Sequence, residues 1–440
     1  MEQSQPWKGR DFLMQIHTIE PGESIYSIGQ EYGVPPSRII TDNLLRSVSD
    51  LAVGQDLVIL TPTVTHTVAA GDTVQSIAAR YGTDTNAIYR NNPILGGLPE
   101  IYPGQILNIA YEMPPLGDIF SNGYAYTGID RSILRRTLPY LTYLSVFSYG
   151  IREDGSLIVP DEADELIATA REYGTVPLLV LTSLTENGTF SSELAGRVLS
   201  VPELRQAVVR NVAAEVVSAG YGGVDADFEY IPADYADEYA LFLREIGDAL
   251  GEGYAVFVSL APKYRADQPG LLYEGHDYSQ IGNAADRVML MTYELGYAYG
   301  PPLAVSPINE VRRVLDYGVT EIPREKLLMG LPNYGYDWTL PYVRGQSRAR
   351  SLGNQEAVDL AQTYGAVIRF DENAQAPYFT YTAGEPASNH IVWFQNARSY
   401  DSLLRLVNEY GIWGAGVWNI MRFDPALWQV MNALYEIRKV

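Results

Sequence analysis

One eleven-residue stretch, Gly220-Tyr-Gly-Gly-Val-Asp225-Ala-Asp227-Phe-Glu229-Tyr230, carries three acidic residues at a spacing of two. Side chains alternate along a β-strand, so Asp225, Asp227 and Glu229 would point the same way, with neighbouring carboxylates about 6–7 Å apart. The long amphipathic segment 201–219 and the glycines that follow it predict a helix, a tight turn and then a strand that ends in acids. In a parallel barrel, the carboxyl end of a strand carries the chemistry.

Carboxylates this close resist joint ionisation, so the pKa of at least one of them should rise. A carboxyl that stays protonated near neutral pH can serve as a general acid. For an isolated pattern of this kind, a solvated acidic turn and a calcium-binding loop remain open. The apolar residues Val224 and Phe228, together with glycines that precede the acids rather than interrupt them, favour the buried strand.

Composition excludes several classes of function. The chain has 440 residues, which predicts two or three domains, and its net charge of -22 argues against nucleic acid as a partner. It has no run of eighteen apolar residues, so no membrane span is predicted. The absence of cysteine excludes disulfides and cysteine-ligated metals. Four scattered histidines and no phosphate-binding loop lead us to expect no metal and no other cofactor.

The N-terminal residues 1–13, MEQSQPWKGRDFL, lack the charged and then apolar pattern of a signal peptide. A more regular segment opens at Met14, so we expect residues 1–13 to be an extension or to lie upstream of the true start.

The first hundred residues contain an internal repeat. The segment that begins at His17 aligns with the segment that begins at His66, an offset of 49 residues. Each copy reads as strand, glycine turn, helix, second helix and strand. Gly33 and Gly82 fit helix C-caps. Units this short bury little on their own, so we expect two small βααβ modules, at 14–61 and 62–110.

The repeated pattern resembles the lysin motif (LysM) domain, seen twice. This resemblance implies binding of glycans that contain N-acetylglucosamine, such as peptidoglycan or chitin. It places a binding groove between the first turn and the loop after the second helix. The corresponding positions are Gly22, Ser24, Ile25 and Asn43 in the first copy and Gly71, Thr73, Val74 and Asn92 in the second. The alternative that these residues only build turns stays open, and Ser24 and Thr73 also fit helix N-caps.

A short proline-containing connector at 111–117 marks the expected domain boundary, and beyond it strand-like runs alternate with helical ones over 118–440. The expected strands are 123–126, 143–149, 176–181, 223–228, 254–260, 287–293, 326–331 and 414–418. Eight strand–helix units predict an α/β fold, a (β/α)8 TIM barrel.

The gap between the seventh and eighth expected strands is too long for a plain loop. We therefore expect a small α+β insertion at about 337–392, with a helix over 354–364. Its expected strands are 367–371, 378–382 and 390–394.

The catalytic part, 117–440, resembles glycoside hydrolase family 18. The family's strand-four signature D-G-x-D-x-D-x-E corresponds to Gly222-Gly-Val-Asp225-Ala-Asp227-Phe-Glu229, with Gly222 in place of the first acid, at the base of the strand. The strand-six motif corresponds to Met291-Thr-Tyr293-Glu294, and the strand-eight tryptophan to Trp418. The segments 289–307 and 330–338 look most similar to the LysM-bearing N-acetylglucosaminidases of spore-forming bacteria, which degrade spore cortex peptidoglycan.

This resemblance implies a mechanism in which the 2-acetamido group of the substrate is the nucleophile. Glu229 would protonate the glycosidic oxygen and later deprotonate water. Asp227 would orient the acetamido group, and Asp225 would share a proton with Asp227. The hydroxyl of Tyr293 would bind the acetamido carbonyl oxygen.

Trp418 would form the apolar floor beneath the sugar, and core packing is the alternative for it. Four further residues are candidates for the substrate pocket: Met291, Glu294, Asn333 and Tyr336. For Met291, a role in the core is the stronger alternative.

Three functions are consistent with these residues. The first is a hydrolase of peptidoglycan, monomeric and associated with the spore or cell wall. The second is a chitinase, since both polymers present the same sugar at the cleaved bond. The third is a non-catalytic glycan-binding protein. Lectins within glycoside hydrolase family 18 commonly lose the strand-four glutamate, so the presence of Glu229 favours an enzyme.

Overall fold

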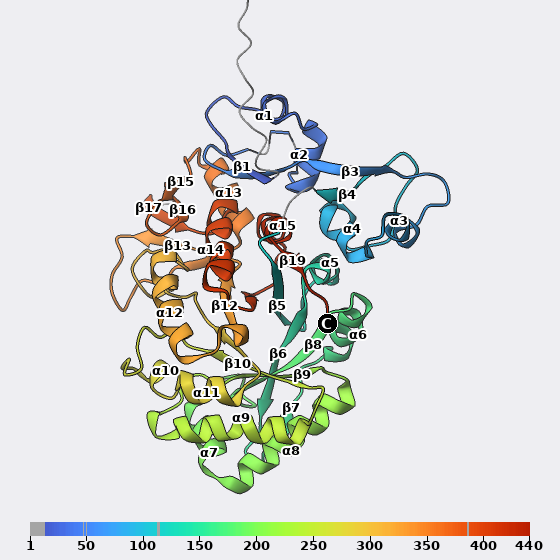
Figure 1. Cartoon of the computed structure of the whole chain (residues 1–440). Helices are drawn as coiled ribbons and strands as arrows, with labels where there is room; N and C mark the ends of the chain where they lie inside the picture. The colour runs from blue at the N-terminus through green and yellow to red at the C-terminus, as the bar shows by residue number, and fades with distance from the viewer. Residues whose placement is uncertain (1–13, 47, 50, 112–114, 385–386) are drawn as a thin grey trace, which may run out of the picture.

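The computed structural model describes residues 14–46, 48–49, 51–111, 115–384 and 387–440 (Figure 1). The expected N-terminal extension, 1–13, and part of the expected connector, 112–114, lie outside these residues. The described chain forms two small α/β units followed by a closed parallel barrel, which confirms the predicted fold class. No helix in these described ranges combines the length and apolarity that a membrane crossing requires.

The barrel contains all eight expected strands. They are β5 (Asp118–Tyr126), β6 (Tyr143–Ile151), β8 (Val176–Thr182), β9 (Gly223–Asp227), β10 (Ala255–Leu260), β11 (Arg287–Leu290), β12 (Leu327–Pro332) and β18 (Gly414–Trp418). Neighbouring strands pair in parallel in this order, and pairing of β5 with both β6 and β18 closes the cylinder. The strands are buried on both faces and therefore read as nearly continuous apolar runs, which is why the sequence revealed them.

Helices surround the barrel (Figure 1). They are α5 (Arg131–Thr137), α6 (Ala163–Glu172), α7 (Ser192–Ser200), α8 (Pro202–Ala219), α9 (Ala236–Leu250), α10 (Leu271–Glu274), α11 (Tyr278–Ala284), α12 (Ile308–Glu321), α14 (Ala397–Tyr410) and α15 (Pro425–Leu434). Short 3-10 turns are η1 (Pro93–Leu95), η2 (Leu138–Tyr140), η3 (Ala233–Tyr235) and η4 (Arg324–Lys326), and short strands are β7 (Leu157–Ile158) and β19 (Glu436–Ile437).

Helix α8 positions the acidic strand. Its buried residues Leu204, Val208, Val212 and Val216 recur every fourth position and form one apolar stripe. Gly220 ends the helix with φ 82°, a conformation that favours glycine, and β9 begins three residues later.

The insertion between β12 and β18 is a five-stranded antiparallel sheet with one helix, α13 (Asn354–Thr363). Its strands are β13 (Gly335–Leu340), β14 (Arg350–Leu352), β15 (Arg369–Asp371), β16 (Ala376–Ala383) and β17 (Ser388–Trp393). The sequence analysis missed β13 and β14. Strand β13 follows the end of β12 after two residues, so the two strands read as one segment, and the insertion starts at Gly335 rather than at 337. After α15 ends at Leu434, the chain forms β19 beside β5.

The two N-terminal units have the same elements. The first contains β1 (Met14–Thr18), α1 (Ile25–Tyr32), α2 (Pro36–Asp42) and β2 (Asp56–Leu60), and the second contains β3 (Pro62–Thr67), α3 (Val74–Tyr81), α4 (Thr85–Asn91) and β4 (Ile106–Tyr111). In each unit the two strands pair antiparallel.

Both units pack directly on the barrel, at the end where α13, α15 and α5 lie (Figure 1). Val58 and Leu60 of β2 belong to the main hydrophobic core of the barrel. Arg90 of α4 is 7% exposed and donates hydrogen bonds to the carbonyl of Pro139 at 3.1 Å and to Oδ1 of Asn432 at 3.0 Å. Burying a guanidinium is costly unless its donors find partners, and the barrel supplies these two.

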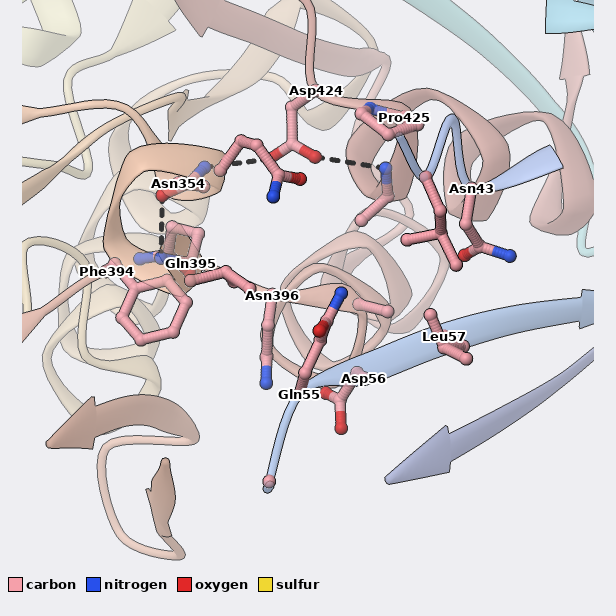
Figure 2. Close-up of a pocket in the computed structure, with 16 residues that line it drawn as sticks. Asn43, Gln55, Asp56, Leu57, Asn354, Phe394, Gln395, Asn396, Asp424 and Pro425 are labelled. Atoms are coloured by element: carbon pink, nitrogen blue, oxygen red, sulfur yellow. Dashed lines mark hydrogen bonds between the residues drawn. The ribbon is translucent and has the colours of Figure 1, made fainter. Parts of the chain in front are cut away.

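Close backbone contact fixes the first unit against the insertion. Gly54 has φ 85°, and a Cβ there would lie 1.9 Å from the carbonyl oxygen of Ile368. Figure 2 shows the pocket at this seam, where Gln55 and Leu57 of the first unit face Asn354 and Asp424 of the catalytic part. The N-terminal units are therefore joined to the barrel by packed surfaces as well as by the connector.

Candidate active site

Asp225 lies at the centre of the barrel, where three hydroxyls hold it. Its carboxylate accepts hydrogen bonds from Tyr124 at 2.7 Å and Ser145 at 2.9 Å, and a longer one from Ser259 at 3.4 Å. These donors come from β5, β6 and β10. Burial raises the pKa of Asp225, and the three hydrogen bonds oppose that rise.

Asp227, two residues further along β9, is buried but not satisfied. Its Oδ1 has no hydrogen-bond partner among the described residues. Burial raises its pKa well above the usual range, and the charges of Glu229 and Asp225 raise it further. Asp227 therefore holds a proton more readily than a solvent-exposed carboxyl does, and it has one oxygen ready for a polar group of a ligand.

Glu229 follows the end of β9 and is half-buried. Burial raises its pKa, and the charge of Glu294 raises it further, which suits a general acid. His276 fixes the peptide just before it: Nε2–H donates to the carbonyl of Phe228 at 2.9 Å, and Nδ1 accepts from the N–H of Ala261 at 3.0 Å. Burial lowers the pKa of His276 to about 4, so its imidazole is neutral.

Tyr293 and Glu294 follow β11. Tyr293 is 6% exposed, and its ring lies so close to Gly330 that a Cβ there would be 2.7 Å from it. Burial and the surrounding acids raise the pKa of Tyr293 well above its usual value, so the hydroxyl stays a donor. Glu294 is exposed at the mouth of the site, and its Oε1 accepts hydrogen bonds from Tyr336, at 2.6 Å, and from Tyr334.

Trp418 ends β18 and is half-exposed. Its ring packs against those of Phe147, Tyr124 and Tyr126, with centroids 4.9, 5.8 and 6.1 Å away. This arrangement leaves an apolar indole surface at the carboxyl end of the barrel, as a sugar-binding floor requires.

Asn333, a candidate for the substrate pocket, is buried instead of lining an open pocket. It is 3% exposed, and its Nδ2 donates to the carbonyls of Asn419 at 3.1 Å and Arg422 at 2.8 Å. Asn333 therefore holds the loop that follows Trp418. Met291 is half-buried and packs against the aromatic cluster that contains Tyr293 and Tyr336.

The fold thus gathers most of the expected residues at the carboxyl ends of β9, β11 and β18 and at the start of β13. They are Asp225, Asp227, Glu229, Tyr293, Glu294, Tyr336 and Trp418. The sequence analysis missed the residues that support them: Tyr124, Ser145, Ser259, His276 and Tyr334. For Ser145 and Ser259 the available signal was a serine inside a largely apolar strand, since a polar residue at a buried position needs a partner.

In the N-terminal units, several expected glycan contacts have structural roles. Ser24 and Thr73 cap α1 and α3 through capping boxes. Ile25 and Val74 are 0% exposed, in the cores of their units.

The two asparagines also serve their own units. Asn43 donates to the carbonyl of Val58 at 2.9 Å and accepts from its N–H at 2.8 Å, and Asn92 makes the same pair of bonds with Asn108. The side chains of Asn43 and Asn92, like those of the buried Ile25 and Val74, therefore make their contacts within their own units. Gly22 and Gly71, with φ 90° and 91°, form the first turns.

One group of potential metal ligands, His17, Glu23 and Glu31, occurs among the described residues. His17 Nε2 lies 2.9 Å from the Glu23 carboxylate, and His66 lies 2.8 Å from Asp72 in the second unit. In each unit the acid of this pair also accepts a hydrogen bond from the turn, Glu23 from the N–H of Glu20 and Asp72 from that of Ala69.

A closed barrel with two buried carboxyls and one half-buried carboxyl at the carboxyl end of its fourth strand, beside a half-exposed indole, defines a barrel glycoside hydrolase. The chain belongs to the glycosyl hydrolases family 18, whose pattern matches residues 125–422, and LysM domains match residues 17–60 and 66–110. The resemblances inferred from the sequence are thereby confirmed.

Two known proteins are similar over nearly the whole chain, and a third over most of it. The cortical fragment-lytic enzyme of Bacillus anthracis is 34% identical over 440 residues, covering 97% of this chain and 100% of that protein. The Bacillus cereus spore cortex-lytic enzyme SleL has 33% sequence identity to this chain, and its crystal structure superposes with a TM-score of 0.82. The match covers 97% of this chain and 99% of that one. A chitinase from Chromobacterium violaceum is 26% identical with a TM-score of 0.66, covering 72% of this chain and 98% of that one.

Proposed function

We propose that this enzyme hydrolyses the β-1,4 bond that follows N-acetylglucosamine in peptidoglycan, with retention and with the substrate's acetamido group as the nucleophile. The observation that supports this proposal best is the buried Oδ1 of Asp227, which lacks a partner beside the protonatable Glu229. An amide N–H of the substrate would supply the missing partner.

The first step breaks the glycosidic bond. Glu229 gives its proton to the glycosidic oxygen as the bond to C1 breaks, and the acetamido oxygen forms the new bond to C1. Asp227 binds the acetamido N–H and stabilises the positive charge of the oxazolinium ring. The hydroxyl of Tyr293 donates to the acetamido oxygen and aligns it.

The second step restores the enzyme. Glu229, now ionised, takes a proton from water, which attacks C1 and opens the oxazolinium ring. Asp225 sits behind Asp227, and its charge raises the pKa of Asp227. Asp225 thereby helps to keep one proton shared within the acidic pair.

Peptidoglycan is the proposed polymer, and the spore or cell wall the proposed location. Two LysM domains accompany the catalytic barrel. Relatives that match along the full chain carry names that refer to cortex lysis. Chitin is the second candidate, because the catalytic part is also similar to a chitinase. A purely glycan-binding role is disfavoured by the presence of Glu229.

Mass analysis of products tests the proposal. Purified wild-type protein and Glu229→Gln would be incubated with spore cortex fragments and, separately, with chitin oligomers. The proposal predicts new reducing ends at N-acetylglucosamine from the cortex fragments, and none from Glu229→Gln. Cleavage of chitin oligomers alone would establish the chitinase alternative.

A further inference from the structure

The segment that joins β13 to β14, residues 341–349, is basic in an acidic protein. It reads PYVRGQSRA, so it holds Arg344 and Arg348 and no acidic residue, whereas the whole chain has a net charge of -22. Arg350 follows directly as the first residue of β14.

This segment lies on the rim of the catalytic cleft. Its Tyr342 hydroxyl donates to the carbonyl of Tyr299 at 3.0 Å, and its Ala349 N–H donates to the carbonyl of Ala298 at 2.7 Å. Residues 298–299 belong to the loop that leaves Glu294. On the same wall, Tyr336 of β13 donates to Glu294 at 2.6 Å.

Arg350 and Arg348 differ in what holds them. Arg350 bonds to Glu356 and lies 3.6 Å from the carboxylate of Asp337. Arg348 is exposed, forms no ion pair with any residue of the described ranges, and lies with Cζ 5.4 Å from the ring centre of Tyr299. A guanidinium over a ring keeps its in-plane N–H groups available. Arg348 is thus positioned but not neutralised.

The interior of the cleft is acidic, with Asp225, Asp227, Glu229 and Glu294 converging on it. A neutral glycan such as chitin meets no charge penalty there. Peptidoglycan carries carboxylates on its lactyl groups and stem peptides, and the negative charge that remains on this acidic cluster repels them. A cation at the rim offsets that repulsion, and a guanidinium binds a carboxylate with two parallel hydrogen bonds.

We propose that Arg348, supported by Tyr299, binds a carboxylate on a substituent of the glycan strand in the cleft and so favours acidic peptidoglycan over chitin. The inference rests on the proposed function and names a specificity residue for it. Arg348 touches the substrate's substituent and takes no part in bond cleavage.

The test uses matched ligands. Two of them are peptidoglycan fragments that bear stem peptides and the same fragments after enzymatic removal of the peptides. Two more are the derivatives of these fragments in which the carboxyls are converted to methylamides. The last are chitin oligomers of equal length. For Arg348→Gln we expect KM for the carboxylated fragments to rise about 10-fold with kcat nearly unchanged, as for a lost charge-assisted contact. KM for methylamides and chitin should stay within about 2-fold, and Arg348→Lys should fall between. Comparing fragments with and without peptides shows whether the carboxylate is on the peptide or the lactyl group.

Arg344→Gln is the matched control, since Arg344 is an exposed arginine of the same segment. It should leave every KM unchanged. Equal losses on methylamides and chitin, or no loss on any ligand, would overturn the role of Arg348.

Binding separates this inference from the proposed function. Dissociation constants would be measured in Glu229→Gln protein with and without Arg348→Gln, so that binding is read without turnover. If the wild type leaves cortex fragments uncut while Arg348→Gln still weakens carboxylate binding selectively, the proposed function fails and the inference stands. If cortex fragments are cut but Arg348→Gln changes the dissociation constants of carboxylated and methylamide ligands equally, the inference fails while the proposed function stands.

Discussion

The hydroxyl of Tyr124 on β5 donates a 2.7 Å hydrogen bond to the carboxylate of Asp225 on β9, across the interior of the barrel. Both side chains are almost inaccessible to solvent, at 1% and 0% exposure. A buried carboxylate depends on such donors, because hydrogen bonds to charged groups are worth about 1.5–3 kcal/mol. The bond keeps Asp225 more acidic than burial alone would allow.

Tyr124→Phe removes this donor without changing the shape of the ring. The pKa of Asp225 should rise further, so the Asp225–Asp227 pair carries less negative charge. It should then stabilise the positive oxazolinium ring less well, and kcat should fall about 10-fold or more. Steady-state kinetics on N-acetylglucosamine oligomers would measure the change. Tyr149→Phe is a matched control, because Tyr149 is fully buried but bonds to Tyr221 and Glu215 on the outer side of the barrel. A wild-type kcat in Tyr124→Phe would contradict the role given to this pair.

Glu294→Gln tests whether the charge of Glu294, at the mouth of the site, acts on the pKa of Glu229. The negative charge of Glu294 raises the pKa of Glu229, so its removal should lower that pKa. The acid form of Glu229 would then be lost at a lower pH, and the alkaline limb of the kcat/KM profile should move to lower pH. An alkaline limb that stays in place or moves upward would show that Glu294 does not influence the acid.

The barrel could be predicted from sequence because its strands are apolar runs of ordinary length and its acids recur at a spacing of two, on β9 for Asp225 and Asp227 and just after its end for Glu229. The partners of Asp225 could not be predicted in the same way. Tyr124 and Ser145 lie 101 and 80 residues from it in the chain, and only the closed sheet brings them together. The contact of Arg90 with Asn432 spans 342 residues, which explains why docking of the LysM domains was also missed.

His276 predicts a pH-dependent contribution to stability. Its pKa is about 4 in the folded protein, against 6.5 for a solvent-exposed imidazole, so the unfolded chain binds the proton more readily. The stability that wild type gains over His276→Gln should therefore be full above about pH 6.5 and shrink as the pH falls toward 4, by roughly 3 kcal/mol in total. Denaturant unfolding of both proteins between pH 7.5 and pH 4 measures this gap. A gap that is constant over this range would contradict the prediction.

Packing of the LysM domains predicts that their removal affects more than glycan affinity. A protein that begins at Leu116 loses the contacts of Val58 and Leu60 with the main core. Burial of one such side chain contributes about 1.5–3 kcal/mol, so Tm should fall by several degrees. The shortened protein should still cleave small soluble fragments at temperatures where it is folded, and should bind weakly to cell-wall sacculi. An unchanged Tm would support domains that are only tethered.

The use of the substrate's own acetamido group is the central claim, and one comparison tests it directly. Two oligosaccharides would be compared, identical except that the sugar on the non-reducing side of the cleaved bond carries an N-acetyl group in one and a free amine in the other. Product formation would be followed by mass spectrometry at equal enzyme concentration. The account predicts cleavage of the N-acetylated substrate and no detectable cleavage of the amine, because Asp227 and Tyr293 can only align a nucleophile that is present. Comparable turnover of both substrates would contradict it and would leave Asp227 as a direct nucleophile.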